Sequence, residues 1–208
     1  MRKRIIIGIL SLIGFIILLL LLLTNNISSF DDYIYKIMQS IRCGFFDYIF
    51  LFFTKLGNSI PATILTIILL IFLNKKDRYI LGSSMIITLL MNQGIKYIIK
   101  RPRPPIEERL ITQGGYSFPS GHSMMALCLY GILIYLSVTK IENKKIKILL
   151  VLLFSTIILL IGLSRIYLRV HYPSDVLAAY LLTLLILIVN ITITSHIRGN
   201  MNEKDADK

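Results

Sequence analysis

Charged side chains are scarce in this sequence. Only 16% of its 208 residues are Asp, Glu, Lys or Arg, whereas 55% are hydrophobic, and the mean hydropathy is +0.74. A soluble domain of this length cannot bury so much apolar side chain in its own core. The composition therefore excludes an ordinary soluble domain and predicts a membrane protein whose outer surface faces lipid.

Cysteine and acidic residues are also few. Cys43 and Cys128 match no metal or redox spacing, and Cys128 falls within an apolar run, which argues against a disulfide between them. The net charge is +12, but the basic residues occur in short clusters between apolar runs. That pattern is typical of orientation in a bilayer, for which anionic lipid is a sufficient partner. We therefore predict contact with the lipid bilayer, no nucleic acid and no obligate protein partner.

Six apolar runs predict transmembrane helices. A helix needs about 20 residues to cross the hydrocarbon layer, and the runs that we assign are 5–23, 60–73, 79–99, 123–139, 148–163 and 176–194. The second run is short, but residues 56–59 can extend it, and Pro61 suits a first helical turn. No internal repeat interrupts the chain. The expected fold is all-α, a six-transmembrane-helix bundle forming one domain over residues 1–208.

Residues 31–54, between the first two predicted spans, form the ambiguous stretch. The aromatic run 45–53 is apolar but too short to cross, and its aromatics with mixed charge favour the headgroup zone. We predict an interfacial helical segment here.

The first span also resembles a signal peptide, but its apolar core is longer than a typical signal core and no A-x-A site follows. We predict that it is retained.

The orientation of the bundle follows from its basic clusters. Alternate loops and the tail 196–208 carry them, at Arg2, Lys3 and Arg4; Lys75, Lys76 and Arg78; Lys140, Lys144, Lys145 and Lys147; and Arg198, Lys204 and Lys208. Short loops rich in Lys and Arg remain in the cytoplasm. We therefore predict cytoplasmic termini, a polar cytoplasmic tail at 196–208, and loops 100–122 and 165–175 on the outer side.

Three polar segments, 96–104, 118–123 and 164–175, interrupt the apolar sequence on that outer side. Each has an ordinary structural interpretation. Lys96 could extend to the membrane interface, Arg103 could bind lipid headgroups, and Ser120 with Gly121 could form a simple turn. Asp175 could be only a first-turn acid of the last helix. Taken singly, none of these features establishes a function.

Together, the three segments favour an anion site. They bring Lys96, Arg103 and Arg165 to one side of the membrane with few acids to pair them. Arginine forks and a lysine point charge suit phosphate. Backbone N–H groups of Ser120-Gly121-His122, at a predicted helix start, can bind the same anion.

Two histidines of the same outer segments supply chemistry. His171 and Asp175 are four residues apart, so a helical turn would let the carboxylate orient the imidazole, as in a nucleophile–orienter pair. His122 is then free to protonate a leaving oxygen. The segments contain no tight Asp, Glu and His cluster that could hold paired metal ions. The sequence thus predicts phosphoryl transfer without a metal or other cofactor.

These segments resemble the motifs of the type 2 phosphatidic acid phosphatase superfamily of membrane lipid phosphatases. That family carries K-x6-R-P, P-S-G-H and S-R-x5-H-x3-D, which stand here as Lys96…Arg103-Pro104, Pro119-Ser120-Gly121-His122 and Ser164-Arg165…His171…Asp175. All three occur in order within a motif core at 96–175. Arg101-Pro102 offers a second R-P, but its lysine position would be Gly94, so Arg103 is the matching residue.

The resemblance implies roles for these residues and a class of substrate. His171 would form a phosphohistidine and Asp175 would orient it, while His122 would protonate the leaving group; the phosphoryl oxygens would be held by Lys96, Arg103, Ser120, Gly121 and Arg165. The residues around these motifs also resemble the phosphatidylglycerophosphatase B group of bacterial membranes. That resemblance favours phosphatidylglycerol phosphate as the substrate. Phosphatidic acid and undecaprenyl diphosphate stay open as substrates. A lipid transporter or a non-catalytic headgroup-binding protein would need the cations but not the His171–Asp175 pair.

Overall fold

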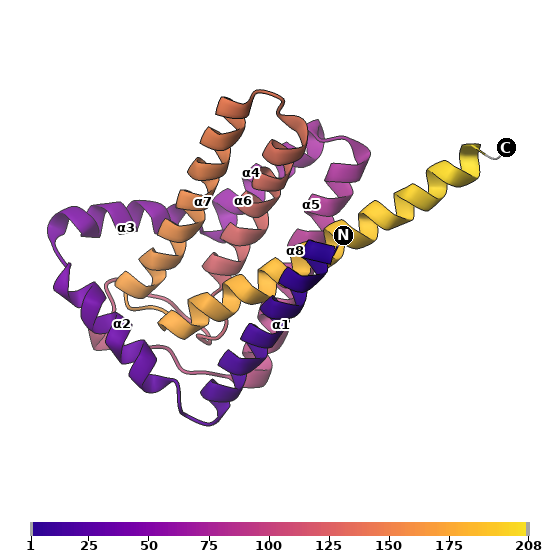
Figure 1. Cartoon of the computed structure of the whole chain (residues 1–208). Coiled ribbons are helices and arrows are strands. Elements are labelled where there is room, and N and C mark those ends of the chain that lie inside the picture. Colours follow the sequence, from indigo (N-terminus) through magenta and orange to yellow (C-terminus); the bar gives the residue numbers. More distant parts are fainter. Residues whose placement is uncertain (1, 207–208) are drawn as a thin grey trace.

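The computed structural model describes the backbone of residues 2–206 and the side chains of residues 2–196 other than Ser59. Within this range the regular elements are all helical (Figure 1): α1 Arg2–Leu23, α2 Ser28–Ser40, α3 Gly44–Leu56, α4 Ser59–Phe72, α5 Lys75–Ile99, the short 3-10 helix η1 Ile106–Glu108, α6 Gly121–Lys140, α7 Lys144–Tyr167 and α8 Pro173–Ala206. The predicted all-α fold is confirmed.

The number of membrane spans is only approximately six. Among the described residues, α1, α6, α7 and α8 are each long and apolar enough to cross a membrane. The predicted second span is the 14-residue helix α4, which is too short by itself. It becomes a candidate only together with α3, from which it is bent by 46°. Helix α5 has 25 residues, which is long enough, but its polar residues leave it less apolar than the other four.

The segment between the first two predicted spans, expected to be an interfacial helical segment, consists of the two helices α2 and α3. Helix α2 runs along the lower left edge of the bundle in Figure 1, and α3 leads from it into α4. The predicted extension of the second span through residues 56–59 is not a continuous helix, because α3 ends at Leu56 and α4 begins at Ser59. Gly57 lies in this break, where an added Cβ would come within 2.5 Å of Ile161 Cγ2. Close packing of the turn against α7 therefore requires glycine there.

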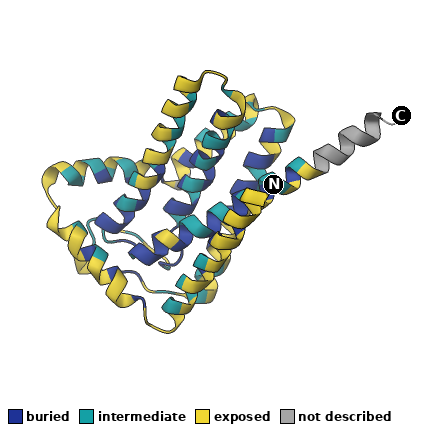
Figure 2. Ribbon diagram, in the orientation of Figure 1, coloured by how far each residue is buried: buried dark blue, intermediate teal, exposed yellow. Residues whose placement is uncertain are grey.

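Apolar side chains cover the outside of the bundle as well as its centre. Many large hydrophobic residues of α1, α4 and α7 are exposed, and only 17% of the most apolar window of α1 is buried (Figure 2). Such a surface would be costly in water, since burial of apolar area is what stabilises a soluble fold. The helices therefore present the lipid-facing exterior that the composition predicts.

The four helices α5, α6, α7 and α8 bring their polar ends together at one end of the bundle. Helix α5 ends at Ile99, where Lys100 adopts a left-handed conformation (φ 50°) before Pro102. Helix α6 starts after Ser120, and Pro173 begins α8 at the position where proline is favoured. The backbone N–H of Ser120 donates to the Asp175 carbonyl across 3.2 Å, which joins two of these ends directly.

The basic loops lie at the opposite end of the bundle. The α4–α5 and α6–α7 connections are at the top of Figure 1, away from the long connection between α5 and α6. Apart from His196, the predicted polar tail 196–208 lies outside the residues whose side chains are described.

Candidate active site

The structure brings the predicted site residues to the end of the bundle where α5, α6, α7 and α8 meet. Each lies at a helix end or in an adjoining loop. The C-terminal ends of α5 and α7 meet the N-terminal ends of α6 and α8 here, because successive helices run in opposite directions. They are Lys96 in the last turn of α5, Arg103 in the following loop, Ser120 before α6, Gly121 and His122 in its first turn, Arg165 in the last turn of α7, His171 in the α7–α8 loop, and Asp175 in the first turn of α8.

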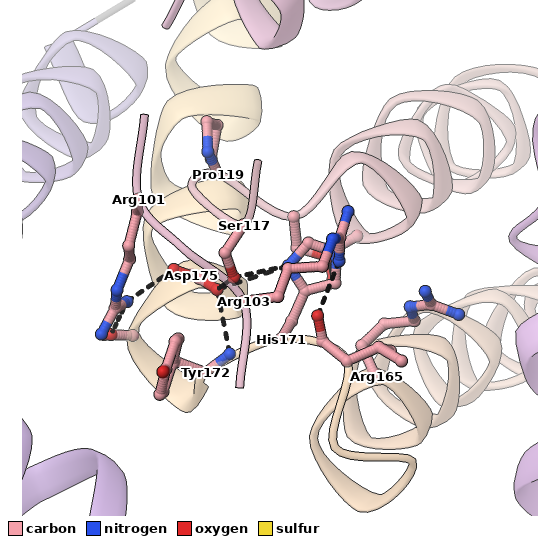
Figure 3. A network of polar contacts seen from close by, with 12 residues as sticks. Arg101, Arg103, Ser117, Pro119, Arg165, His171, Tyr172 and Asp175 are labelled. Atoms are coloured by element: carbon pink, nitrogen blue, oxygen red, sulfur yellow. Dashed lines mark hydrogen bonds and ion pairs between the residues drawn. The ribbon is translucent and has the colours of Figure 1, made fainter. Parts of the chain in front are cut away.

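His171 is held through both nitrogens of its ring. Its side chain is 1% exposed, with Nδ1 3.3 Å from Asp175 Oδ2 and Nε2 2.9 Å from Arg103 Nη1. The residues lie together in Figure 3. A guanidinium can only donate, so Nε2 must be the acceptor. We therefore assign the proton to Nδ1, which donates to Asp175 and leaves a lone pair on Nε2.

Asp175 is completely buried and surrounded by donors. Arg101 Nη1 lies 2.6 Å from Oδ1, the Tyr172 N–H lies 2.9 Å from Oδ2, and the Ser117 hydroxyl also donates to Oδ2. Three donors in addition to the imidazole favour an ionised carboxylate with one fixed orientation. The predicted i,i+4 reach between His171 and Asp175 is present, although His171 precedes α8 rather than lying within it.

The environment of His171 keeps its ring neutral. Burial lowers the pKa of His171 well below its ordinary value of 6.5, and the positive charges of Arg103, Arg165 and Lys96 lower it further. Because the shift is downward, the imidazole stays unprotonated at neutral pH and through pH 6.5. The Nε2 lone pair is consequently available for nucleophilic chemistry.

Arg165 has an unsatisfied donor in the buried site. Its side chain is 1% exposed, Nη1 donates to the Thr54 hydroxyl, and Nη2 donates to Gln113 Oε1 across 2.9 Å. Its Nε has no hydrogen-bond partner among the described residues. Leaving a buried guanidinium donor unpaired is costly, so this N–H indicates a place for a ligand oxygen.

Arg103 is anchored by backbone carbonyls. Its Nε donates to Gly115 O at 2.9 Å and to Gly114 O at 3.1 Å, and Nη1 donates to Val170 O at 2.6 Å. These bonds hold the guanidinium against the His171 ring. Burial lowers the pKa of Arg103 to about 10, which leaves it charged at neutral pH.

Lys96 and His122 complete the polar surface around this site. Lys96 lies close enough to Arg103, Arg165 and Asp175 to interact with them electrostatically. His122 and Arg165 line a cavity of about 390 Å³, whose other lining residues are Leu51, Thr54, Lys55, Asn58, Ile111, Thr112 and Gln113. A headgroup in this cavity would lie beside both a histidine and an arginine.

The start of α6 is positioned by polar contacts that leave fewer N–H groups for an anion than expected. Ser120 has its backbone N–H on the Asp175 carbonyl and its hydroxyl 2.9 Å from Ser123 Oγ. The N–H groups of Gly121 and His122 begin the helix, where first-turn donors have no intrahelical partner. Asn92 supports this turn by donating to the Pro119 carbonyl at 3.1 Å.

Several site residues escaped the sequence analysis. The motif spacing selects Arg103 instead of Arg101, and Asp31, the second acid beside Arg101, lies in the predicted interfacial segment 31–54. No local pattern marks the remaining residues, because they act through contacts between distant segments. The missed residues are Asp31, Asn92, Arg101, Gln113, Ser117 and Thr54.

Comparison with known proteins identifies the family. The model of the PAP2 superfamily matches residues 78–198, more than half of the chain. The chain belongs to the PAP2 superfamily. Phosphatidylglycerophosphatase B of Bacillus subtilis (strain 168) is 33% identical over 181 residues, covering 83% of this chain and 87% of the relative.

Solved structures agree with this PAP2 assignment. The crystal structure of the transmembrane PAP2 type phosphatidylglycerolphosphate phosphatase from Bacillus subtilis superposes with a TM-score of 0.81 at 30% identity, covering 91% of this chain and 96% of that one. LpxE of Aquifex aeolicus superposes with a TM-score of 0.64 at 27% identity, over 77% and 93% of the two chains. This PAP2 protein is therefore a bacterial membrane phosphatase that dephosphorylates a lipid phosphate.

Proposed function

We propose that this PAP2 phosphatase removes the terminal phosphate of phosphatidylglycerol phosphate through a phosphohistidine at His171. The observation that carries the mechanism is the His171 ring, which bonds Asp175 through Nδ1 and keeps an unprotonated Nε2 beside Arg103. The substrate is supported by the similarity to the phosphatidylglycerophosphatase B and the phosphatidylglycerolphosphate phosphatase of Bacillus subtilis. Phosphatidic acid and undecaprenyl diphosphate are the alternative candidate substrates.

The reaction has two steps. In the first, Nε2 of His171 attacks phosphorus, the bond from phosphorus to the lipid oxygen breaks, and His122 gives a proton to that oxygen. In the second, water attacks the phosphohistidine and gives a proton to His122. The N–P bond breaks, its electron pair returns to Nε2, and inorganic phosphate leaves. Asp175 accepts from Nδ1 throughout and stabilises the positive ring of the intermediate.

Substrate binding must displace one contact of His171. Arg103 Nη1 lies 2.9 Å from Nε2, the position that phosphorus must approach. A phosphoryl oxygen can take this donor, which frees the lone pair and turns the arginine into a ligand of the transferring group. Arg165 Nε, Lys96 and the N–H groups of Gly121 and His122 supply further donors for the charge of the transition state.

The mechanism uses these cations in place of metal ions. Among the described residues, no group of three His, Cys, Asp or Glu side chains could hold a metal. Vanadate adopts the five-coordinate geometry of the transition state and should inhibit by binding the same cationic site. Phosphate release is therefore expected to continue in EDTA.

Lys55 is proposed to distinguish the substrates. It lines the cavity that contains His122 and Arg165. Phosphatidylglycerol phosphate carries an internal phosphodiester beyond its terminal phosphate, whereas phosphatidic acid carries only the terminal group. With the terminal phosphate at His171, a second anion in the cavity can contact the Lys55 ammonium.

The purified enzyme in EDTA should release phosphate faster from phosphatidylglycerol phosphate than from phosphatidic acid or undecaprenyl diphosphate. Lys55→Ala should raise KM for phosphatidylglycerol phosphate about 5- to 30-fold, as expected for one charge-assisted contact, and leave KM for phosphatidic acid unchanged. Lys36→Ala, at an exposed lysine of α2, is the control. Preference for another lipid would overturn the substrate, and activity lost in EDTA but restored by magnesium would overturn the metal-free mechanism.

We also propose that the site faces the outside of the bacterial membrane and that the termini are cytoplasmic. The arrangement of the basic loops at the end of the bundle away from the site supports this orientation (Figure 1). With the native cysteines replaced by serine, Thr112→Cys should react with an impermeant thiol reagent in intact cells and Glu142→Cys should not. Both positions are exposed, and Glu142 avoids the helix-capping Asn143. Labelling in the reverse order would place the site in the cytoplasm.

A further inference from the structure

Arg101 lies between two buried carboxylates. Its Nη1 is 2.6 Å from Asp175 Oδ1, and its Nη2 is 2.7 Å from Asp31 Oδ2. The side chains of Arg101 and Asp31 are 10% and 2% exposed, respectively. The guanidinium also lies over the Tyr172 ring, 3.9 Å from its centroid. Arg101 thus connects helix α2 to the carboxylate that orients His171. Figure 3 shows Arg101 beside Asp175.

Helix α2 also contacts the first turn of α8 and the α7–α8 connection. Asp31 accepts from the Ser174 N–H at 2.9 Å and from the Ser174 hydroxyl at 2.8 Å. One turn later, the Tyr35 hydroxyl donates to the His171 carbonyl at 2.9 Å. The nucleophile His171 and the first turn of α8 are therefore bonded to the same face of α2, since positions four apart lie together on a helix.

The bond from Arg101 selects the orientation of Asp175. Arg101 occupies Oδ1, which leaves Oδ2 for the His171 ring, the Tyr172 N–H and Ser117. The positive charge of Arg101 alone would weaken the attraction between Asp175 and a positive imidazole ring. Asp31 offsets that charge, so the three groups together carry a net charge of −1. Burial raises the pKa of Asp31, while hydrogen bonds from Arg101 and Ser174 lower it.

We propose that Arg101 and Asp31 are positioning residues for phosphoryl transfer. Arg101 fixes the Asp175 carboxylate, and Asp31 both anchors Arg101 and keeps the group negative as positive charge develops on His171. This inference rests on the roles of His171 and Asp175 in the proposed function. Helix α2 would then contribute to catalysis and would not be only an interfacial segment between the first two spans.

The isosteric change Asp31→Asn tests the proposal, because Asn can still accept from the Ser174 N–H. We expect kcat to fall about 10- to 100-fold, by analogy with the loss when a hydrogen-bond partner that orients a metal ligand is altered, with KM unchanged. The phosphate-binding cations are untouched, so inhibition by vanadate should keep its wild-type affinity. Asp32→Asn, at the neighbouring exposed acid of α2, is the matched control and should match wild type.

A double-mutant cycle separates positioning from general structural support. If Asp31 acts through Asp175, then Asp31→Asn should have no further effect on kcat in an Asp175→Asn background. Radiolabelled phosphate release gives the required sensitivity, and thermal unfolding checks that each variant is folded. Multiplicative losses in the cycle, a rise in KM, or wild-type kcat in folded Asp31→Asn would each overturn the proposal.

The same experiment distinguishes failure of the proposal from failure of the proposed function. Full activity of Asp175→Asn would refute the role of Asp175 as the orienting carboxylate. The positioning role proposed for Arg101 and Asp31 would then lose its basis. Inactive Asp175→Asn beside fully active Asp31→Asn would refute only the contribution of Arg101 and Asp31. Arg101→Gln, which removes the charge between the two acids, should lower kcat at least as much as Asp31→Asn, with the same dependence on Asp175.

Discussion

His171→Asn is expected to lower phosphate release by about five to six orders of magnitude, the scale seen when a catalytic nucleophile is removed. The variant loses the only atom that the mechanism uses to attack phosphorus, Nε2. Asparagine is preferred to alanine because His171 is 1% exposed, and an alanine would leave a cavity in the site. The asparagine amide can still donate to Asp175 in place of Nδ1.

The measurement is phosphate release from a short-chain lipid phosphate in detergent, with thermal unfolding of each protein as the folding check. In wild type, quenching with denaturing detergent at alkaline pH during turnover of a radiolabelled substrate should trap phosphate on the protein, because the N–P bond of phosphohistidine is stable in base and hydrolyses in acid. In His171→Asn no phosphate should be trapped. Glu107→Gln, at an exposed acid of the α5–α6 connection, should behave as wild type. Appreciable turnover by folded His171→Asn would contradict the phosphohistidine mechanism.

Asp175→Asn is expected to lower kcat about 10³- to 10⁴-fold, by analogy with the orienting acid of a catalytic triad. Donors from Arg101, Tyr172 and Ser117 converge on the Asp175 carboxylate, as does the His171 Nδ1–H. An amide offers one acceptor oxygen and an NH2 group that must face some of those donors. If the NH2 faces His171, Nδ1 becomes the acceptor and the proton moves to Nε2, which blocks attack.

KM should change much less than kcat in Asp175→Asn, because Asp175 contacts no phosphoryl oxygen in the mechanism. The variant should keep a small residual activity, since the cations that bind phosphate are intact. The measurement is kcat and KM of the folded variant by steady-state kinetics. A fall in kcat of less than about tenfold would mean that Asp175 is a structural acid of α8, the interpretation that its position after Pro173 also allows.

Much of the candidate site could be predicted because its residues lie at the ends of apolar runs. The lengths of these runs place Lys96, Ser120, Arg165 and Asp175 near the same membrane surface, and the motif spacing then selects the histidines. Prediction was weaker between residues 24 and 74. There α3 and α4 meet at a 46° bend, and neither is long enough to cross alone. Their arrangement depends on the packing of α3 against α7 and of α4 against α5 and α6, to which hydropathy is insensitive.

The amino-acid sequence alone is enough to predict an all-helical membrane phosphatase of the PAP2 superfamily with a cationic, histidine-containing motif core. Those properties follow from the length of apolar runs and from short spacings, which are local. Which groups hold these residues depends on how the helices pack in three dimensions. Arg101 meets partners 70 and 74 residues away, and Arg165 meets Thr54 across 111 residues. Such pairs form because buried charges must find partners once helices pack, and nothing in the local sequence specifies which partners those are.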